Sequence, residues 1–350
     1  MTTQTIHDLE TPSVLIDLDR MARNIERMQA RCDSLGLAFR PHIKTHKIPD
    51  IARQQLDAGA VGIACQKVTE ARVFADAGLT DIQIPYNIVG SKKTARLVDL
   101  AGDHHLTVSA DHAEVIAGLS QAAAARNLTL RVMVDLVTDI QRTGAPADRV
   151  LDLAQRIDSD DHLHFAGLLV YPSNATVRPD LQQALDSLEK AGINVESVSG
   201  GGTGAALQAQ DVPELTELRV GTYVFNDMNT VTSGWCAVED CTMTVLATVV
   251  SRPTDDRGIL DSGSKTLAAD RVADGHGHIV EYPDAHIYKL NEEHAYVDFS
   301  ACDSRPAIGE QVRVIPVHTC VVSNLHHQLY GVRGDTVEVI WPVAARGLVW

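Results

Sequence analysis

The segment Arg40-Pro-His-Ile-Lys-Thr-His-Lys47 holds the densest group of reactive side chains in the chain. Five of its eight residues are basic or imidazole, and it continues the strand-like run Leu37-Ala-Phe39. A lysine among other cationic groups can have its pKa lowered enough to act as a nucleophilic amine. Lys44 is therefore the candidate for a Schiff-base lysine. The alternative is a solvated basic loop or an anion-binding patch.

A glycine-rich turn, Ser199-Gly-Gly-Gly-Thr203-Gly204, follows an expected strand and precedes an expected helix. Glycines let backbone N–H groups approach an anion closely, and a helix N-terminus adds positive potential. The pattern predicts a phosphate cradle, with a flexible turn as the alternative. A second turn, Arg219-Val-Gly221-Thr222-Tyr223, lies one strand–helix step later. Adjacent loops near the end of a barrel are the usual place for a phosphate site.

The pair His318-Thr-Cys320 follows an expected strand at Val312–Val317. On a strand, residues two apart face the same side, so we expect both side chains to point at one ion. Imidazole and thiolate suit Zn²⁺ or another borderline metal. An isolated pair of this kind is more often structural, and the motif alone does not decide between the two.

Strand-like runs alternate with helical patterns over the first 220 residues, which predicts a parallel sheet with crossover helices. The expected strands are Ser13–Asp17, Leu37–Ile43, Val61–Ala64, Ile82–Pro85, Leu106–Ser109, Leu128–Asp135, Phe165–Val170, Val195–Ser199 and Leu218–Val220. Nine strands are one more than a closed (β/α)8 barrel needs, and a doubly wound sheet stays open. The expected helices are Ser91–Ala101, Asp111–Arg126, Ala147–Ile157 and Asp180–Ala191.

In a βα barrel, catalytic groups sit at the carboxyl ends of the strands. Lys44 has that placement, and so do Arg142, in the loop after Leu128–Asp135, and Tyr171, directly after Phe165–Val170. From about residue 235 the helical patterns cease. Short strands between Gly, Pro and Asp turns then predict a mostly antiparallel β domain.

Composition narrows the class of protein further. The formal net charge of −16 argues against nucleic acid or an anionic membrane as a general partner. No apolar run is long enough to span a membrane, and Met1–Glu10 lacks the pattern of a signal peptide. The six scattered cysteines do not form a disulfide framework. We therefore expect a cytoplasmic protein with reduced thiols.

With these motifs together, the chain resembles the D-threonine aldolase and D-serine dehydratase family. That family belongs to the fold-type III pyridoxal phosphate enzymes, which have alanine racemase-like barrels. The matching motifs run through nearly the whole chain in the expected order. They are Arg40–Lys47, Ser199–Thr203, Gly221-Thr-Tyr223-Val-Phe-Asn-Asp227, Asp261-Ser-Gly-Ser-Lys265, Glu292-Glu-His294 and His318-Thr-Cys320.

The resemblance implies a (β/α)8 TIM barrel of alanine racemase type plus a mostly antiparallel β domain. The strand at Ser13–Asp17 would belong to the β domain, and the other eight strands would close the barrel. The implied boundaries are 20–234 for the barrel, with 1–19 and 235–350 forming the β domain. The family also implies a homodimer.

The resemblance assigns roles to residues as well. Lys44 would hold pyridoxal 5'-phosphate, with His42 and Tyr171 as further catalytic residues. Arg142 would approach the phenolic oxygen or the ring face of the cofactor, and His318 and Cys320 would bind a divalent metal, Zn²⁺ or Mn²⁺. The residues around the phosphate would be Gly201, Gly202, Thr203, Gly221, Thr222 and Tyr223.

The reaction that the resemblance implies is cleavage of a D-β-hydroxy-amino acid to glycine and an aldehyde. The alternative is dehydration of D-serine or 3-hydroxy-D-aspartate to a keto acid and ammonia. An amino-acid racemase and a non-catalytic pyridoxal phosphate-binding protein are further alternatives. A racemase needs a second base on the opposite cofactor face, and no tyrosine in the sequence matches that role clearly.

Overall fold

The computed structural model describes residues 4–350, and these form two compact units. The sequence predicted that Met1–Glu10 is not a signal peptide. Three residues of this segment, Met1–Thr3, lie outside the described residues. The barrel unit comprises Met28–Lys44, Ile51–Gly221 and Leu348–Trp350. The sheet unit comprises the described part of Met1–Arg27 together with Thr45–Asp50 and Thr222–Gly347.

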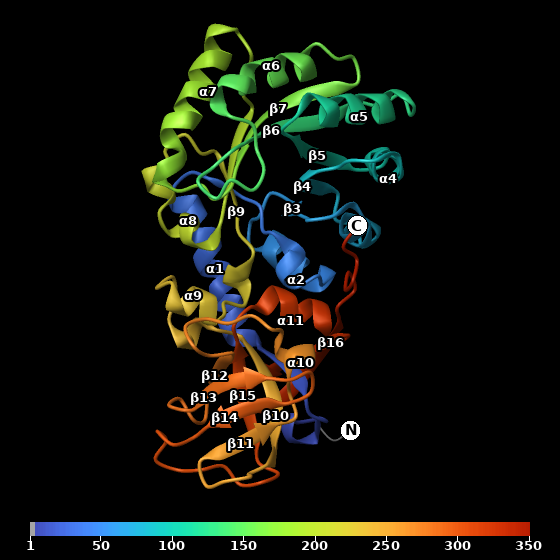
Figure 1. Ribbon diagram of the computed structural model, residues 1–350. Coiled ribbons are helices and arrows are strands. Elements are labelled where there is room, and N and C mark those ends of the chain that lie inside the picture. The colour runs from blue at the N-terminus through green and yellow to red at the C-terminus, as the bar shows by residue number, and fades with distance from the viewer. Residues whose placement is uncertain (1–3) are drawn as a thin grey trace. The chain divides into compact units, whose positions relative to one another are not determined.

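The barrel unit contains eight parallel strands in the order β2-β9-β8-β7-β6-β5-β4-β3 (Figure 1). Each strand is parallel to its neighbour, as crossover helices require. The strands are β2 (Ala38–Phe39), β3 (Ile63–Ala64), β4 (Asp81–Asn87), β5 (His105–Ala110), β6 (Leu130–Leu136), β7 (Leu163–Val170), β8 (Ser197–Gly201) and β9 (Glu217–Arg219).

Backbone hydrogen bonds join the two ends of this sheet. The Val61 N–H donates to the Phe39 carbonyl at 2.9 Å, and the Ala64 N–H donates to the Pro41 carbonyl at 2.8 Å. A parallel bridge also pairs His42 with Ala64. These contacts close the sheet, so the predicted (β/α)8 barrel is confirmed and the doubly wound alternative is wrong.

Helices follow the strands and bury one face each. In α6, for example, Val150, Leu153, Ala154 and Ile157 are buried, the spacing of one apolar stripe, and the helix packs on β6 and β7. The helices of this region are α2 (Pro49–Asp57), α3 (Val68–Asp76), α4 (Ser91–Ala101), α5 (Ala113–Ala124), α6 (Ala147–Asp158), α7 (Arg178–Lys190) and α8 (Thr203–Leu207).

The sheet unit has strands in the order β13-β14-β11-β10-β1-β16-β17, and β15 pairs with both β10 and β12. Every pair is antiparallel except β1 with β16, so the predicted mostly antiparallel β domain is confirmed. Strand β1 lies in this sheet and not in the barrel, as the resemblance implied. The strands are β1 (Ser13–Asp17), β10 (Met243–Ser251), β11 (Arg257–Leu260), β12 (Gly277–Ile279), β13 (His286–Leu290), β14 (Ala295–Asp298), β15 (Gln311–Pro316), β16 (Gln328–Arg333) and β17 (Thr336–Pro342).

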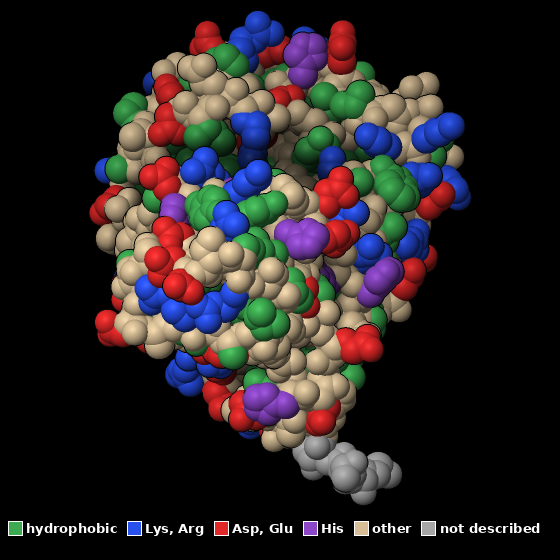
Figure 2. All heavy atoms as spheres, turned by 60° about the horizontal axis from the view of Figure 1, so that its bottom comes forward, with side chains coloured by type: hydrophobic (Ala, Val, Ile, Leu, Met, Phe, Trp, Pro, Cys, Tyr) green, Lys and Arg blue, Asp and Glu red, His purple; other side chains and the backbone are tan. Residues whose placement is uncertain are grey.

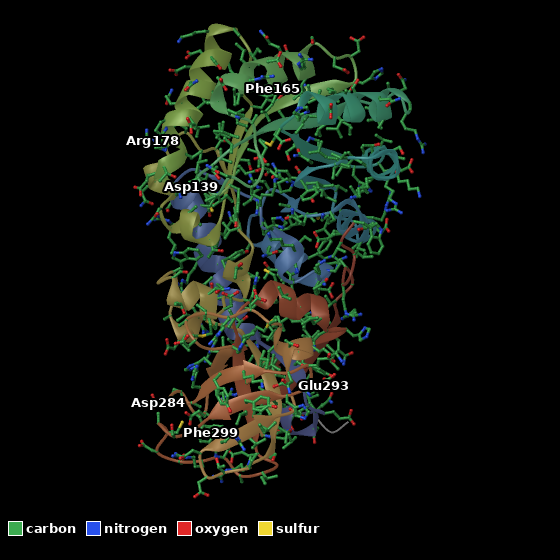
Figure 3. All side chains as sticks on the ribbon, in the orientation of Figure 1. Asp139, Phe165, Arg178, Asp284, Glu293 and Phe299 are labelled. Carbon is green, nitrogen blue, oxygen red and sulfur yellow. The ribbon has the colours of Figure 1, made fainter. Side chains whose placement is uncertain are left out.

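The remaining helices are short apart from the first. They are α1 (Leu18–Ser34), α9 (Met228–Thr232), α10 (Ser264–Leu267) and α11 (Thr319–Leu325). Within the sheet unit, Phe299 follows β14 and is buried, with its ring edge-to-face on Tyr282 at 5.4 Å between centroids (Figure 3). This contact packs the turn after β14 against the turn that precedes β13.

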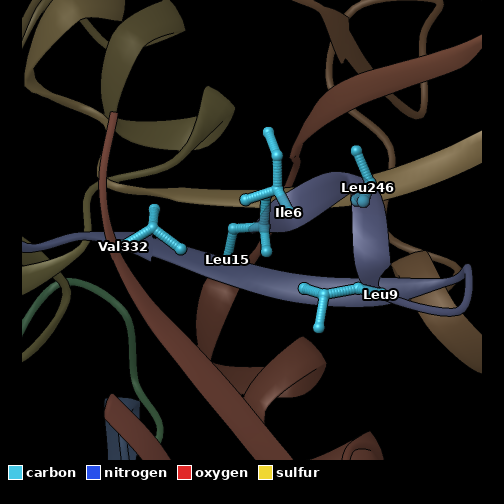
Figure 4. Packing of buried hydrophobic residues seen from close by; sticks show 5 residues of the cluster. All are labelled: Ile6, Leu9, Leu15, Leu246 and Val332. Atoms are coloured by element: carbon cyan, nitrogen blue, oxygen red, sulfur yellow. The ribbon is translucent and has the colours of Figure 1, made fainter. Parts of the chain in front are cut away.

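A cluster of five buried side chains holds the N-terminal segment to the sheet (Figure 4). Ile6 and Leu9 come from the first turn of the chain, Leu15 from β1, Leu246 from β10 and Val332 from β16. Each buried aliphatic side chain stabilises the fold by about 1.5–3 kcal/mol relative to an exposed one. The cluster therefore fixes β1 between strands that lie more than 200 residues later.

The surface is mixed in charge. Lysine and arginine side chains are interspersed with aspartate and glutamate over the face drawn in Figure 2. Within residues 4–350, no helix is both long enough and apolar enough to cross a membrane.

Candidate active site

Lys44 lies at the carboxyl end of β2, where the sequence placed it. The expected strand Leu37–Ile43 is shorter in the structure, because it turns into a 3-10 helix, η2 (Ile43–Thr45), shortly after Pro41. The backbone of His42 still donates to the Val220 carbonyl at 2.8 Å, and the His42 Nδ1 accepts from the Lys44 N–H at 3.4 Å. His42 therefore fixes the turn that presents Lys44.

The basic residues around Lys44 do not gather as a cationic group. Arg40 points into the barrel, where its Nε lies 2.8 Å from Glu217 and its Nη1 lies 2.6 Å from Asp81. Lys47 donates to the Ala345 carbonyl at 3.2 Å. The expectation of a cluster of cationic neighbours was wrong, because Arg40 and Lys47 each have other partners.

The predicted phosphate turn lies at the end of β8. Gly200 and Gly201 are the last residues of the strand, and Gly202 has a φ of +111° directly before α8. A Cβ added at Gly201 would lie 3.1 Å from the Arg219 carbonyl oxygen and 3.1 Å from the Tyr171 ring. The N–H groups of a first helical turn have no partner inside the helix. A glycine cradle with such N–H groups fits a phosphate.

Tyr171 and Arg142 meet beside this turn. The Arg142 guanidinium lies over the Tyr171 ring, 4.6 Å from its centroid. The Arg142 loop is held to the segment after Tyr171, because Asp139, which is labelled in Figure 3, accepts a hydrogen bond from Thr176 Oγ1 at 3.1 Å. Two residues predicted from different loops thus converge on the glycine turn.

Sequence reasoning missed Arg219 as a site residue. This arginine ends β9 and is 4% exposed, and its Nη1 donates to the Ser199 carbonyl at 2.7 Å and to the Ser199 hydroxyl at 2.5 Å. Burial lowers the pKa of its guanidinium to about 10. The available signal was an arginine at the end of a barrel strand, β9, whose three residues are all buried.

Asp135 was also missed, at the end of β6. Burial raises the pKa of its carboxyl to about 6, against the opposing effect of a 2.9 Å hydrogen bond from Thr143 and the charge of Arg219. Perturbed carboxyls of this kind are concentrated at functional sites. Arg219 and Asp135 place opposite charges at the carboxyl end of the barrel.

The second predicted turn follows β9. Gly221 closes the barrel segment, and the 3-10 helix η5 (Thr222–Val224) begins the next segment of the sheet unit. The Thr222 carbonyl accepts from the Phe225 and Asn226 N–H groups, and Tyr223 is buried. The structure therefore places these residues in a well-ordered turn, and their role toward a phosphate stays a prediction.

The expected strand geometry of His318 and Cys320 was wrong. Strand β15 ends at Pro316, His318 is the N-cap of α11, and Cys320 lies in the first turn of that helix. The two side chains nevertheless hydrogen-bond to each other. This hydrogen bond with Cys320, together with a second one to Asp270, raises the pKa of His318 to about 9. Thr45, the residue after Lys44, places its Oγ1 3.3 Å from the Cys320 Sγ.

The donor set of this pair fits a borderline divalent metal, since imidazole nitrogen and thiolate sulfur are the usual ligands of Zn²⁺. Among residues 4–350, no group of three or more His, Cys, Asp and Glu residues is arranged to hold an ion. The pair would supply two ligands to such an ion, and water or substrate would have to complete the coordination.

Comparison with known proteins identifies the family of the chain. Residues 16–228 match the family model "Alanine racemase, N-terminal domain", and residues 242–332 match a "Putative serine dehydratase domain". A D-threonine aldolase from Arthrobacter sp. is 35% identical over 97% of this chain and 93% of its own length. A D-threo-3-hydroxyaspartate dehydratase from Delftia sp. is 31% identical over 90% of this chain and 92% of its own length.

Solved structures give the same result. The crystal structure of a D-threonine aldolase from Filomicrobium marinum superposes with a TM-score of 0.93 at 31% identity, covering 99% of both chains. Another solved structure is a cysteine-to-alanine mutant of D-threo-3-hydroxyaspartate dehydratase in the metal-free form. The chain belongs to the family of alanine racemase-like proteins that includes D-threonine aldolase.

Proposed function

We propose that this protein is a pyridoxal phosphate-dependent lyase of the D-threonine aldolase type, which cleaves D-β-hydroxy-amino acids to glycine and an aldehyde. The observation that carries the proposal is the placement of Lys44 at the carboxyl end of β2, in the same barrel unit as the Gly201–Thr203 turn and the Arg142–Tyr171 pair. This cofactor is held through a Schiff-base lysine and a site for its phosphate, and an arginine near its ring tunes its electronics.

Pyridoxal phosphate, when bound, supplies an electron sink for the electron pair left on Cα. The amine of Lys44 would hold the cofactor and then carry a proton to Cα as glycine forms. The N–H of Thr203, in the first turn of α8, would donate to the phosphate, and Gly201, Gly202, Gly221, Thr222 and Tyr223 would line it. Arg142 would bind the phenolic oxygen side of the cofactor.

We propose that His318 and Cys320 bind a divalent metal, Zn²⁺ or Mn²⁺. Such an ion supplies a Lewis acid that lowers the pKa of the β-hydroxyl of the substrate. The proposal is supported by the hydrogen bond between the two side chains, and by the relative whose cysteine mutant is described as metal-free.

The second candidate function is dehydration of D-serine or 3-hydroxy-D-aspartate. The match of residues 242–332 to a serine dehydratase domain and the 31% identical dehydratase favour it. Both reactions begin with the same residues, and they differ in whether the Cα–Cβ bond or the Cα–H bond breaks. The 35% identical aldolase and the 0.93 TM-score favour cleavage of the carbon–carbon bond.

Product analysis tests the proposal. The purified protein is incubated separately with D-threonine, L-threonine and D-serine, in the presence of pyridoxal phosphate and Mn²⁺ or Zn²⁺. We expect glycine and acetaldehyde in equal amounts from D-threonine, and no aldehyde from L-threonine. Pyruvate and ammonia from D-serine, without glycine from D-threonine, would replace the aldolase proposal with the dehydratase.

We further propose that the protein works in the cytoplasm as a homodimer. All six cysteines lie in the described residues as free thiols, which suits a reducing compartment. Sedimentation of the purified protein at several concentrations checks the dimer, and a monomer throughout would contradict it.

A further inference from the structure

The structure points to Asp270 as the residue that positions the metal ligand His318. This inference rests on the metal site of the proposed function and adds to it a residue outside the ligand pair. The carboxylate Oδ1 of Asp270 lies 3.2 Å from the Nδ1 of His318. Each of the two side chains is about one-third exposed, so the contact is shielded in part from solvent.

The contact selects one tautomer of the imidazole. A carboxylate only accepts hydrogen bonds, so a neutral His318 facing Asp270 must carry its proton on Nδ1. The lone pair is then on Nε2, which is left for a metal ion. Metal-binding histidines in proteins usually donate their other N–H to a carboxylate or carbonyl in this way. Asp270 therefore prepares His318 for coordination through Nε2.

Asp270 is itself held in place by its loop. Val272 and Gly275 exchange two backbone hydrogen bonds of 3.1 and 3.0 Å, which closes the turn that follows Asp270. The ring of His276 bonds the Asp270 carbonyl at 3.1 Å, and the His276 N–H donates to the Ile287 carbonyl on β13 at 3.0 Å. The carboxylate is thus presented from a loop that is anchored to the sheet.

A different carboxylate, Asp227, fixes the backbone between His318 and Cys320. The Asp227 Oδ2 accepts from the Thr319 N–H at 3.2 Å, and its Oδ1 accepts from the Thr230 N–H at 3.0 Å. Asp227 therefore holds the backbone between His318 and Cys320, whereas Asp270 holds the His318 ring. Of these two carboxylates, it is Asp270 that contacts the ring of His318, so it is the one that acts on the orientation and the tautomer of that ligand.

Metal titration of the cofactor-loaded, metal-stripped protein tests this role. Co²⁺ is the probe, because a thiolate-to-cobalt absorption band reports coordination by Cys320, and Zn²⁺ competition gives its affinity. We expect the Kd for metal to rise about 10- to 100-fold in Asp270→Ala and by a smaller factor in Asp270→Asn. The cobalt band should return at saturating Co²⁺, because Cys320 and His318 remain.

Asp274→Asn is the matched control. Asp274 lies in the same loop, but its side chain is 91% exposed, and its carboxylate lies 3.7 Å from the Arg271 guanidinium. We expect its metal affinity to equal that of the unmodified protein. Asp270→Glu, which keeps the carboxylate, should recover part of the affinity lost in Asp270→Ala, and thermal unfolding of each metal-free variant separates loss of fold from loss of the site.

Two outcomes separate the proposals. If the unmodified protein shows the cobalt band and all Asp270 variants bind metal as tightly as it does, the positioning role is wrong and the metal site stands. If the unmodified protein binds neither Co²⁺ nor Zn²⁺, the metal part of the proposed function is wrong, and the role of Asp270 is overturned with it.

Discussion

At the scale of single residues, the sequence located the groups with recognisable chemistry. Lys44, Arg142, Tyr171 and Gly202 were each predicted at the carboxyl end of a barrel strand, and the structure places them there. Their roles stay predictions. Arg219 was quoted only as the first residue of the second turn, and its place in the site was missed, because the contacts of a buried arginine are visible only in the structure.

A pH dependence of stability follows from Asp135. The pKa of its carboxyl is about 6 in the folded chain and near 3.8 when unfolded. Between these values the unfolded chain has released a proton that the folded chain still holds. Asp135 therefore makes the protein less stable as pH rises from about 4 to 6, by about 2–3 kcal/mol in total.

The variant Asp135→Asn removes this titration. The difference in free energy of unfolding, variant minus unmodified protein, should increase from pH 4 to pH 7. Urea denaturation of both proteins at both pH values measures it. Asp139→Asn is the control, since Asp139 is an exposed residue of the following loop. An identical pH dependence of stability in Asp135→Asn and the unmodified protein would show that folding does not raise the pKa of Asp135.

At the scale of elements, periodicity located the long helices well. The helix expected at Ser91–Ala101 has those bounds as α4, and the helix expected at Ala147–Ile157 differs from α6 by one residue. The short elements were predicted less accurately. The turn from β15 into α11 was missed, because a helix of seven residues directly after a strand is too short to show a period.

The end of β8 provides a test at this scale. Gly201→Ala adds a methyl group 3.1 Å from the Arg219 carbonyl oxygen and 3.1 Å from the Tyr171 ring, so the end of β9 or the ring must shift beside the proposed phosphate turn. We expect the Kd for pyridoxal phosphate to rise about tenfold, a loss of about 1.4 kcal/mol. Fluorescence titration of the cofactor-free protein measures this Kd.

Gly118→Ala serves as the matched substitution. Gly118 lies inside α5, and a Cβ there meets no atom within 4 Å. This change should leave the Kd for the cofactor unaltered and raise stability by about 0.5–1 kcal/mol. Equal cofactor affinity in both variants would show that the glycine turn is not the phosphate site.

At the scale of the whole molecule, the order of motifs predicted both the barrel and the sheet. Strand β1 pairs with β10 and β16 across more than 200 residues, and only the resemblance, not periodicity, assigned it to the sheet. Pairing over such distances leaves no local pattern. The predicted boundaries at 20–234 stay a prediction, as does the dimer.

Metal removal is the test that concerns the whole enzyme. Exhaustive chelation should abolish turnover of D-threonine while leaving the visible absorbance of the bound cofactor intact, because Lys44 and the pair His318–Cys320 are separate sets of ligands. Readdition of Mn²⁺ or Zn²⁺ should restore activity. Full turnover by protein shown to be free of metal would contradict the role of the pair.

The central claim is that Lys44 is the residue that anchors the cofactor, and borohydride trapping tests it most directly. Borohydride fixes pyridoxal phosphate permanently to the lysine amine that holds it, and peptide mass spectrometry then locates the added mass. We predict the label on Lys44 alone, and none in Lys44→Ala. A label on Lys47 or on any other lysine, or a protein that retains no label at all, would contradict the account.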